Sequence, residues 1–165
     1  MSNIVIHPIP PLFDSNSRVL ILGSFPSVKS RETCFFYGHP QNRFWKVIST
    51  VLGAPLPTDI EQKKLLLLSH GIALWDTIAK CEIVGSSDAS IANPVANDIT
   101  SITDCADIKQ IYCNGKKSFD MYKKYIEPQI HRSALCLPST SPANASWSIE
   151  RLVVSWSCIK KYLSN

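Results

Sequence analysis

The most distinctive segment of the sequence could bind a flat aromatic ring. Within residues 34–45 (CFFYGHPQNRFW), Phe36 and Tyr37 precede a Gly-His-Pro turn, and the amide of Asn42 follows it. Aromatic side chains in a polar loop can stack on nucleobases, which contributes ~1–3 kcal/mol per base. The next two aromatic residues belong more naturally to the core of a following helix, and Asn42 could equally cap that helix. Base stacking and a purely structural role are therefore both open for this segment.

Motifs for several common chemistries are missing from the sequence. Residues 23–27 (GSFPS) match neither GxxxxGK[ST] nor GxGxxG, which disfavours an ATPase or a dinucleotide-dependent enzyme. The GxSxG pattern of a serine nucleophile is also missing. The six cysteines include no CxxC pair, so we expect a reduced protein without a metal or other cofactor. Cys113 and Cys136 lie in apolar runs and should be buried.

Length and composition predict one ordinary globular domain, residues 1–165. Hydrophobic residues make up 45% of the chain, charged residues 18%, and the net charge is +4. This charge is spread thinly, so it permits a nucleic-acid partner without requiring one. No apolar run approaches the roughly 20 residues that span a bilayer, and the N-terminus has no features of a secretory signal. We therefore expect a cytoplasmic protein that has no membrane partner.

Short apolar runs alternate with helical patterns along the chain. This alternation is typical of a parallel sheet that helices cover on both faces. We expect residues 1–17 to form an irregular arm and residues 23–41 and 85–97 to be loops. The expected strands are 18–22, 72–75, 108–113 and 134–137, and the expected helices are 42 or 43 to 52, 58 or 59 to 70, 98–104, 116–126 and one that starts at 146 or 148.

Unusual polar segments follow each of the expected strands. The carboxyl ends of parallel strands meet at one edge of the sheet, where α/β proteins form their sites. We therefore expect these segments to converge on one site: residues 23–42, 76, 114–117 and 138–144.

Five segments occur in an order that is found in one enzyme family. Together they resemble the uracil-DNA glycosylase superfamily, and most closely its hypoxanthine-DNA (deoxyinosine) glycosylase branch. The resemblance extends from about residue 19 to the last helix. The segments are 23–27 (GSFPS), 37–45 (YGHPQNRFW), 74–76 (LWD), 114–117 (NGKK) and 137–144 (LPSTSPAN).

This resemblance implies a three-layer α/β/α fold with a central four-stranded parallel sheet. It also implies a monofunctional DNA glycosylase without a cofactor, which hydrolyses the N-glycosidic bond of a deaminated base in base excision repair. Such an enzyme must rotate the nucleotide out of the duplex, because the glycosidic carbon is unreachable inside the stack. We expect the protein to act as a monomer on DNA that contains a deaminated base.

The resemblance also assigns a catalytic residue and reveals two departures. Asn42 matches the amide to which the hypoxanthine branch attributes the orientation of the attacking water. Phe25 stands where many members carry Asn or Asp, and Leu137 stands where several carry His or Asn. Leucine cannot donate a hydrogen bond to the departing base, and the loss of one such donor costs a few kcal/mol of transition-state stabilisation. We therefore expect slow uracil excision or a preference for another base.

The remaining candidate residues fall into two groups that the resemblance implies. Tyr37 matches the ring that stacks on the extruded base, and Asp76, which could also cap a helix, matches a position that reads the base edge. The base-binding candidates are Gly23, Ser24, Phe25, Tyr37, Asp76 and Asn114. The DNA-binding candidates are Ser27, His39, Lys116, Lys117, Ser139, Thr140, Ser141, Pro142, Ala143 and Asn144.

Three other functions stay open at this point. A mismatch-specific uracil glycosylase carries a segment close to residues 37–45. A catalytically silent module that binds DNA or nucleotides could use the same fold. A flavodoxin-like protein outside nucleic-acid metabolism would need a bound flavin, for which the sequence offers no signature.

Overall fold

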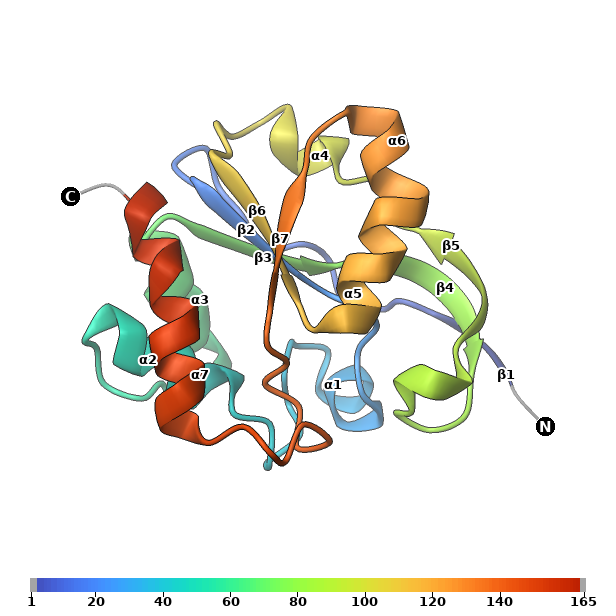
Figure 1. Ribbon diagram of the computed structural model, residues 1–165, viewed down its shortest axis with the longest axis horizontal. Coiled ribbons are helices and arrows are strands. Elements are labelled where there is room, and N and C mark those ends of the chain that lie inside the picture. Colours follow the sequence, from blue (N-terminus) through green and yellow to red (C-terminus); the bar gives the residue numbers. More distant parts are fainter. Residues whose placement is uncertain (1–2, 164–165) are drawn as a thin grey trace.

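The computed structural model describes residues 3–163, and its centre is a parallel sheet of four strands in the order β3-β2-β6-β7 (Figure 1). The strands are β2 (Val19–Gly23), β3 (Ile72–Asp76), β6 (Gln110–Asn114) and β7 (Ala134–Leu137). Every residue of β2 is buried, as expected for a continuous apolar strand with helices on both sides. The four predicted strands are therefore confirmed.

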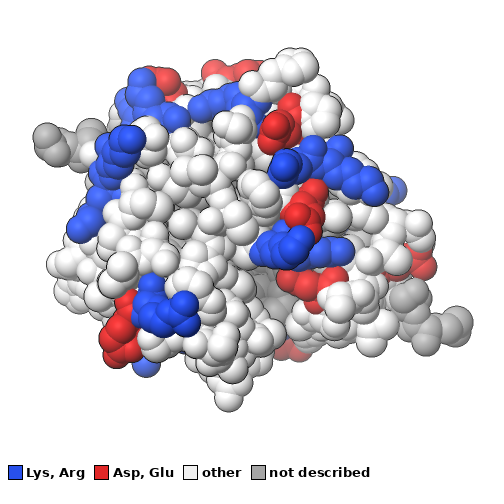
Figure 2. All heavy atoms as spheres, in the orientation of Figure 1, with Lys and Arg blue, Asp and Glu red and all other residues white. Residues whose placement is uncertain are grey.

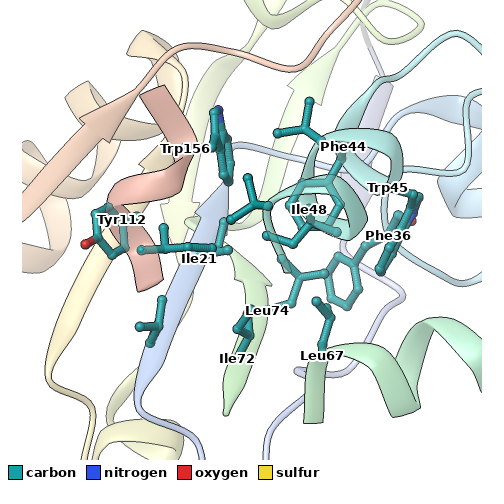
Figure 3. Packing of buried hydrophobic residues seen from close by; sticks show 14 of the residues in the cluster. Ile21, Phe36, Phe44, Trp45, Ile48, Leu67, Ile72, Leu74, Tyr112 and Trp156 are labelled. Atoms are coloured by element: carbon teal, nitrogen blue, oxygen red, sulfur yellow. The ribbon is translucent and has the colours of Figure 1, made fainter. Parts of the chain in front are cut away.

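Two hydrophobic clusters lie on opposite faces of this sheet, because alternate residues of a strand point to opposite sides. Ile21 packs with the first cluster, against α2 (Phe44–Leu52), α3 (Ile60–Ser69) and α7 (Ile149–Trp156), as Figure 3 shows. Leu20 and Leu22 pack with the second. The second cluster includes residues of α4 (Thr100–Thr103) and of the π-helical turn η2 (Tyr122–Ile126), which joins α5 (Lys116–Met121) to α6 (Glu127–Ile130).

Helix boundaries follow from local capping chemistry. Asp59 and Ser148 each accept a hydrogen bond from a backbone N–H three residues further on, which starts α3 and α7. Gly53 ends α2 with a positive φ of 66°, a conformation that suits glycine. After α7 the chain continues in the 3-10 helix η3 (Ser157–Tyr162). No helix within residues 3–163 is long and apolar enough to cross a membrane.

A second sheet corrects two of the predictions. Its three antiparallel strands, in the order β1-β4-β5, are β1 (Asn3–Ile6), β4 (Ile78–Ile83) and β5 (Ala92–Ala96). The irregular arm predicted at residues 1–17 therefore contains a strand, and the loop predicted at 85–97 contains β5 and the short 3-10 helix η1 (Asp88–Ser90). The β-branched run Ile4-Val5-Ile6 favours a strand, although prolines follow closely.

Two further predictions need correction. The predicted loop 23–41 contains a short helix, α1 (Val28–Thr33), which Ser27 caps by accepting a hydrogen bond from the Ser30 N–H. Cys113 is buried as expected, but Cys136 is exposed because the two central residues of β7 face solvent at the edge of the sheet. All six cysteines are free thiols.

Candidate active site

The carboxyl ends of the parallel strands open into a cavity of about 480 Å³. All four segments that were expected to converge contribute to its lining. In Figure 1 the loop after β7 and helix α1 lie at the lower edge of the molecule. The predicted residues that line the cavity are Gly23, Ser24, Phe25, Ser27, Tyr37, His39, Asn42, Asp76, Asn114, Ser139, Thr140, Ser141, Pro142 and Ala143.

One wall of the cavity is a chain of hydrogen bonds between side chains. The Asn114 Nδ2 group donates to the Tyr37 hydroxyl at 3.1 Å and to Thr140 Oγ1 at 3.0 Å. The Thr140 hydroxyl in turn donates to Asn42 Oδ1 at 2.9 Å. The Thr140 N–H also donates to Asn114 Oδ1, at 3.1 Å. Three loops that are far apart in sequence are thus held in one fixed arrangement.

The orientation of the Asn42 amide follows from its partners. Oδ1 accepts the Thr140 hydroxyl and also the Phe44 N–H at 2.9 Å, so both of its lone pairs are used. Nδ2 has no hydrogen-bond partner within residues 3–163. Asn42 therefore supports the start of α2, although Arg43 occupies the N-cap, and it lines the cavity with an amide N–H₂ group that has no partner among the described residues.

The Tyr37 ring is held against the protein core. It stacks on Phe44 with the ring centroids 4.1 Å apart and the planes 17° from parallel. Its backbone has a positive φ of 53°, which is uncommon for a tyrosine, and the residue lines the cavity. Burial raises the pKa of the Tyr37 hydroxyl, with the Asp76 carboxylate adding to the effect, so the group stays neutral. Phe44 and Trp45 are buried in the core, as expected.

Arg43 ties the loop after β7 to the start of α2. Its guanidinium donates to the backbone carbonyls of Ser141 and Asn144, each at 3.1 Å, and to that of Trp147. Its own N–H donates to the Thr140 carbonyl at 3.1 Å. The half-buried guanidinium therefore satisfies three carbonyl groups of one loop, and the backbone N–H of the same residue satisfies a fourth. Together these bonds fix the loop beside Asn42.

Asp76 ends β3 and also lines the cavity. Its side chain is 6% exposed, and its Oδ2 lies 2.7 Å from His7 Nε2. The strand β4 follows almost directly, so the alternative interpretation of Asp76 as a helix cap is wrong. A Cβ atom on Gly23 would lie 2.4 Å from Asp76 Oδ1, so only glycine allows this carboxylate to occupy its place.

Asp88 brings a second carboxylate to the cavity, from η1 between β4 and β5. Its Oδ1 accepts a hydrogen bond from Ser24 Oγ at 2.9 Å. Burial of the carboxyl raises the pKa of Asp88, and the nearby Asp76 adds to this, while the Ser24 hydroxyl and Lys117 oppose it. The residue as a whole is exposed, but its carboxyl lines the cavity.

Three of the predicted residues lie outside this cavity, and one is fully buried. Lys116 and Asn144 line a neighbouring hollow of about 500 Å³, and Lys117 lies beside Lys116 at the start of α5. Lys116 is paired with Asp120 at 2.9 Å. Thr140 is fully buried with its hydroxyl engaged twice, so its side chain positions Asn42.

Positive charge does not form one continuous patch on the face that Figure 2 shows. Figure 2 shows Lys and Arg in separate groups with much uncharged surface between them. Contacts with a polyanion would thus depend on a few lysines together with hydroxyl and backbone N–H groups at the cavity rim.

Sequence reasoning missed the two ionisable residues His7, which contacts Asp76, and Asp88, which lines the cavity. His7 lies in the segment predicted to be an irregular arm, and Asp88 lies in a segment predicted to be a polar loop. The β-branched run before His7 could have indicated a strand. No local pattern indicates that Asp88 folds back onto Ser24, because that contact spans 64 positions.

Comparisons with known proteins agree on the family. The family model described as the uracil DNA glycosylase superfamily matches residues 10–160. A protein of Methanosarcina acetivorans named hypoxanthine DNA glycosylase is 33% identical over 144 residues, which cover 86% of this chain and 90% of that protein. Another with the same name, from Methanosarcina barkeri, is 33% identical over 137 residues, which cover 82% and 85%.

The fold has a close counterpart among solved structures. A solution NMR structure from Methanosarcina acetivorans, described as a candidate uracil DNA glycosylase, superposes with a TM-score of 0.81 at 28% identity, over 96% of this chain and 98% of that one. This likeness confirms the expected α/β architecture with its four-stranded parallel sheet. Sequence motifs, site geometry and fold thus lead to one assignment: the chain belongs to the uracil DNA glycosylase superfamily.

Proposed function

We propose that this DNA glycosylase removes hypoxanthine, and more slowly uracil, from DNA by hydrolysing the N-glycosidic bond. One observation carries the proposal: Asn42 lines the cavity, its amide oxygen is fixed by two protein donors, and its N–H₂ group has no partner within residues 3–163. The curated relatives that bear the name hypoxanthine DNA glycosylase support the choice of lesion.

In this mechanism Asn42 orients water and does not act as a base. Both lone pairs of Oδ1 are engaged, so the amide holds the water by donating a hydrogen bond from Nδ2 to the water oxygen. The second lone pair of the water then faces the sugar C1′. Because the sugar develops oxocarbenium character as the C1′–N bond breaks, an oriented water is sufficient to attack C1′ without a general base. The base leaves with the electron pair of that bond, and the proton that the water loses passes to solvent and neutralises the released base.

Base recognition combines stacking with one charged acceptor. We infer that Tyr37, fixed on Phe44, stacks on the extruded base, and that Asp76 accepts a hydrogen bond from N1–H of hypoxanthine or N3–H of uracil. Leu137 cannot donate a hydrogen bond to the departing base. We therefore expect slower release of uracil, the poorer leaving group of the two. The enzyme would be monofunctional, because the cavity lining includes no lysine that could act as an amine nucleophile within residues 3–163.

The loop after β7 is proposed to hold the distorted strand. Ser139 and Ser141 would contact phosphates beside the lesion, with Lys116 and Lys117 nearby, and the exposed Pro142 and Ala143 would enter the duplex as a wedge. We also propose that Gly23, Ser24, Phe25 and Asn114 contact the base, that Ser27, His39 and Asn144 contribute to DNA binding, and that the protein acts as a cytoplasmic monomer.

The test is base release from matched oligonucleotides that carry hypoxanthine, uracil or xanthine. We expect the wild type to release hypoxanthine fastest and Asn42→Ala to lose about 100-fold in single-turnover rate with DNA affinity retained. Gln41→Ala is the matched control, since this exposed neighbour makes no side-chain hydrogen bond among the described residues.

Each rival function has its own outcome in this experiment. A wild type that binds DNA but releases no base would be a silent binding module. Faster release of uracil from U·G mismatches than of hypoxanthine would indicate a mismatch-specific uracil glycosylase, and flavin absorbance in the purified protein would indicate a flavodoxin-like protein. Full activity in both Asn42→Ala and Asn42→Asp would overturn the site assignment.

A further inference from the structure

A buried histidine supports the cavity from outside the region that the family model matches. The match begins at residue 10, whereas His7 follows β1 and makes the 2.7 Å contact with Asp76. The backbone N–H of His7 donates to the Ala79 carbonyl of β4 at 2.8 Å. This bond helps to hold the imidazole ring next to the end of β3. The side chains of His7 and Asp76 are only 3% and 6% exposed, so the contact between them is buried in the protein and is not a solvent-exposed ion pair.

The hydrogen bonds of His7 fix the position of its proton. Ring atom Nδ1 accepts the Ile9 N–H at 3.1 Å, so Nδ1 carries no proton. The proton of the ring is therefore on Nε2, which donates to Asp76 Oδ2. In this tautomer His7 can only donate to Asp76, and Asp76 can only accept.

Aromatic rings hold the imidazole in this orientation. The rings of Phe25 and Trp75 present T-shaped contacts to it at centroid distances of 5.8 Å and 6.3 Å, and Phe36 lies 6.4 Å away. These rings restrict rotation of the imidazole, and a rotated ring would also lose both hydrogen bonds. Asp76 Oδ2 is thereby occupied, and Oδ1, next to Gly23, remains as an acceptor.

This arrangement matches the chemical change that deamination makes in a base. Adenine N1 and cytosine N3 are acceptors, but hypoxanthine carries N1–H and uracil carries N3–H at the same place. We propose that His7 is a positioning residue that fixes Asp76 as a hydrogen-bond acceptor, so that the cavity favours the N–H created by deamination and repels the lone pair of an undamaged base. This inference deepens the proposed function and rests on it for the identity of the ligand.

Two substitutions separate the hydrogen bond from the packing. His7→Phe retains an aromatic ring in the aromatic surroundings but cannot donate, whereas His7→Gln can donate from its amide. We expect His7→Phe to lower the ratio of hypoxanthine to adenine affinity, measured with the free bases, by about 10-fold or more, and His7→Gln to restore most of that ratio. Thermal unfolding of both variants establishes that they are folded.

A double mutant tests whether His7 acts through Asp76. Because His7 reaches the cavity only by way of that carboxylate, His7→Phe should add little further loss of selectivity to Asp76→Asn. Fully additive losses in the double mutant would contradict the proposal. So would a selectivity in His7→Phe equal to that of the wild type, or a failure of His7→Gln to exceed His7→Phe.

A spectroscopic measurement decides the protonation state independently of catalysis. Long-range proton–nitrogen NMR correlations of His7 at neutral pH should show an unprotonated Nδ1 and a protonated Nε2. A proton on Nδ1 would overturn the inference. If the wild type releases no base, the proposed function fails, and the NMR spectrum together with free-base binding still decides the role of His7.

Discussion

The two sides of the cavity are built from different chemical groups. The side that belongs to the loops of the parallel sheet uses amides and hydroxyls that bind one another: Tyr37, Asn42, Asn114 and Thr140. The side next to the antiparallel sheet uses ionisable groups, with His7 bound to Asp76 and Ser24 bound to Asp88.

This difference separates two tasks. Amides and a neutral phenol keep the same hydrogen-bonding character across the physiological pH range, which suits the positioning of a water molecule. An ionised carboxylate only accepts hydrogen bonds, whereas the protonated group also donates, so the ionised form suits discrimination between a base that carries N–H and one that does not. Under the proposed function, the first side would serve the reaction and the second would serve the selection of the base.

The largest loss of activity should come from a substitution at Gly23, where the two sides of the cavity meet. A Cβ atom on Gly23 would lie 2.4 Å from Asp76 Oδ1 and 3.1 Å from the Tyr37 hydroxyl. Asp76 cannot move away freely, because His7 holds its other oxygen. We expect Gly23→Ala to lose about 100-fold in the single-turnover rate of base release, the cost of misplacing reacting groups by about 1 Å.

Gly53→Ala is the control for this substitution. Gly53 has nothing within 4 Å of its added Cβ, and its φ of 66° strains any other residue. This variant should lose about 1 kcal/mol in the free energy of unfolding and retain its rate. Comparable rates for Gly23→Ala and Gly53→Ala would mean that the two sides of the cavity do not depend on each other.

The parallel-sheet side can be predicted from the sequence far better than the other. Buried parallel strands are short, continuous apolar runs, and the segments after them must meet at one edge of the sheet. The order of these runs along the chain is therefore sufficient to bring together Asn42, Asn114 and residues 138–144. The buried positions of Phe44 and Trp45 likewise follow from helical spacing.

On the other side, Ser24 and Asp76 could be predicted because they follow parallel strands, but His7 and Asp88 could not, because their contacts depend on register and on distant pairing. β1 pairs with β4 across almost the whole first half of the chain, Asn3 opposite Ile83, and no local pattern reveals this partner. His7 and Asp88 reach the cavity only through that sheet. The burial of Thr140 could not be predicted for a similar reason, since it depends on how the loop packs.

The next effect tests the rigidity of the parallel-sheet side. Arg43→Met retains the length of the side chain but removes its donations to the carbonyls of Ser141, Asn144 and Trp147. Because those carbonyls lose a charged donor, we expect a loss of about 2–3 kcal/mol in the free energy of unfolding, measured in urea. Limited proteolysis should show new cleavage in residues 139–147, and base release should slow.

Arg151→Met provides the matched comparison for Arg43. Its guanidinium lies over the Trp147 ring, 3.9 Å from the centroid, so it contacts the same loop from outside. Exposed cation–π contacts contribute about 0.5–1 kcal/mol, so this variant should be only slightly less stable than the wild type. Equal losses in the two variants would show that Arg43 does not have a special role in holding the loop.

The smallest effect should be a dependence of protein stability on pH. It comes from Asp88, on the side of the cavity that carries ionisable groups. Burial raises the pKa of Asp88, so the folded protein binds that proton more tightly than the unfolded chain does. Ionisation of Asp88 therefore opposes folding at neutral pH, whereas below the ordinary aspartate value of about 3.9 the carboxyl is protonated in both states and the opposition disappears. Asp88→Asn should be more stable than the wild type at neutral pH, and this gain should shrink as the pH falls.

Asp98→Asn should change stability in the opposite direction. Hydrogen bonds from the hydroxyl and the N–H of Thr100 lower the pKa of Asp98, so its ionised form favours folding at neutral pH, and this contribution is lost as the pH falls through the lowered value. Urea unfolding of both variants at neutral and acidic pH measures the two opposite changes in the free energy of unfolding in one series. If Asp88→Asn is instead less stable than the wild type at neutral pH, the Asp88 carboxylate is stabilised by its surroundings, and the cavity has no side on which ionisation is costly.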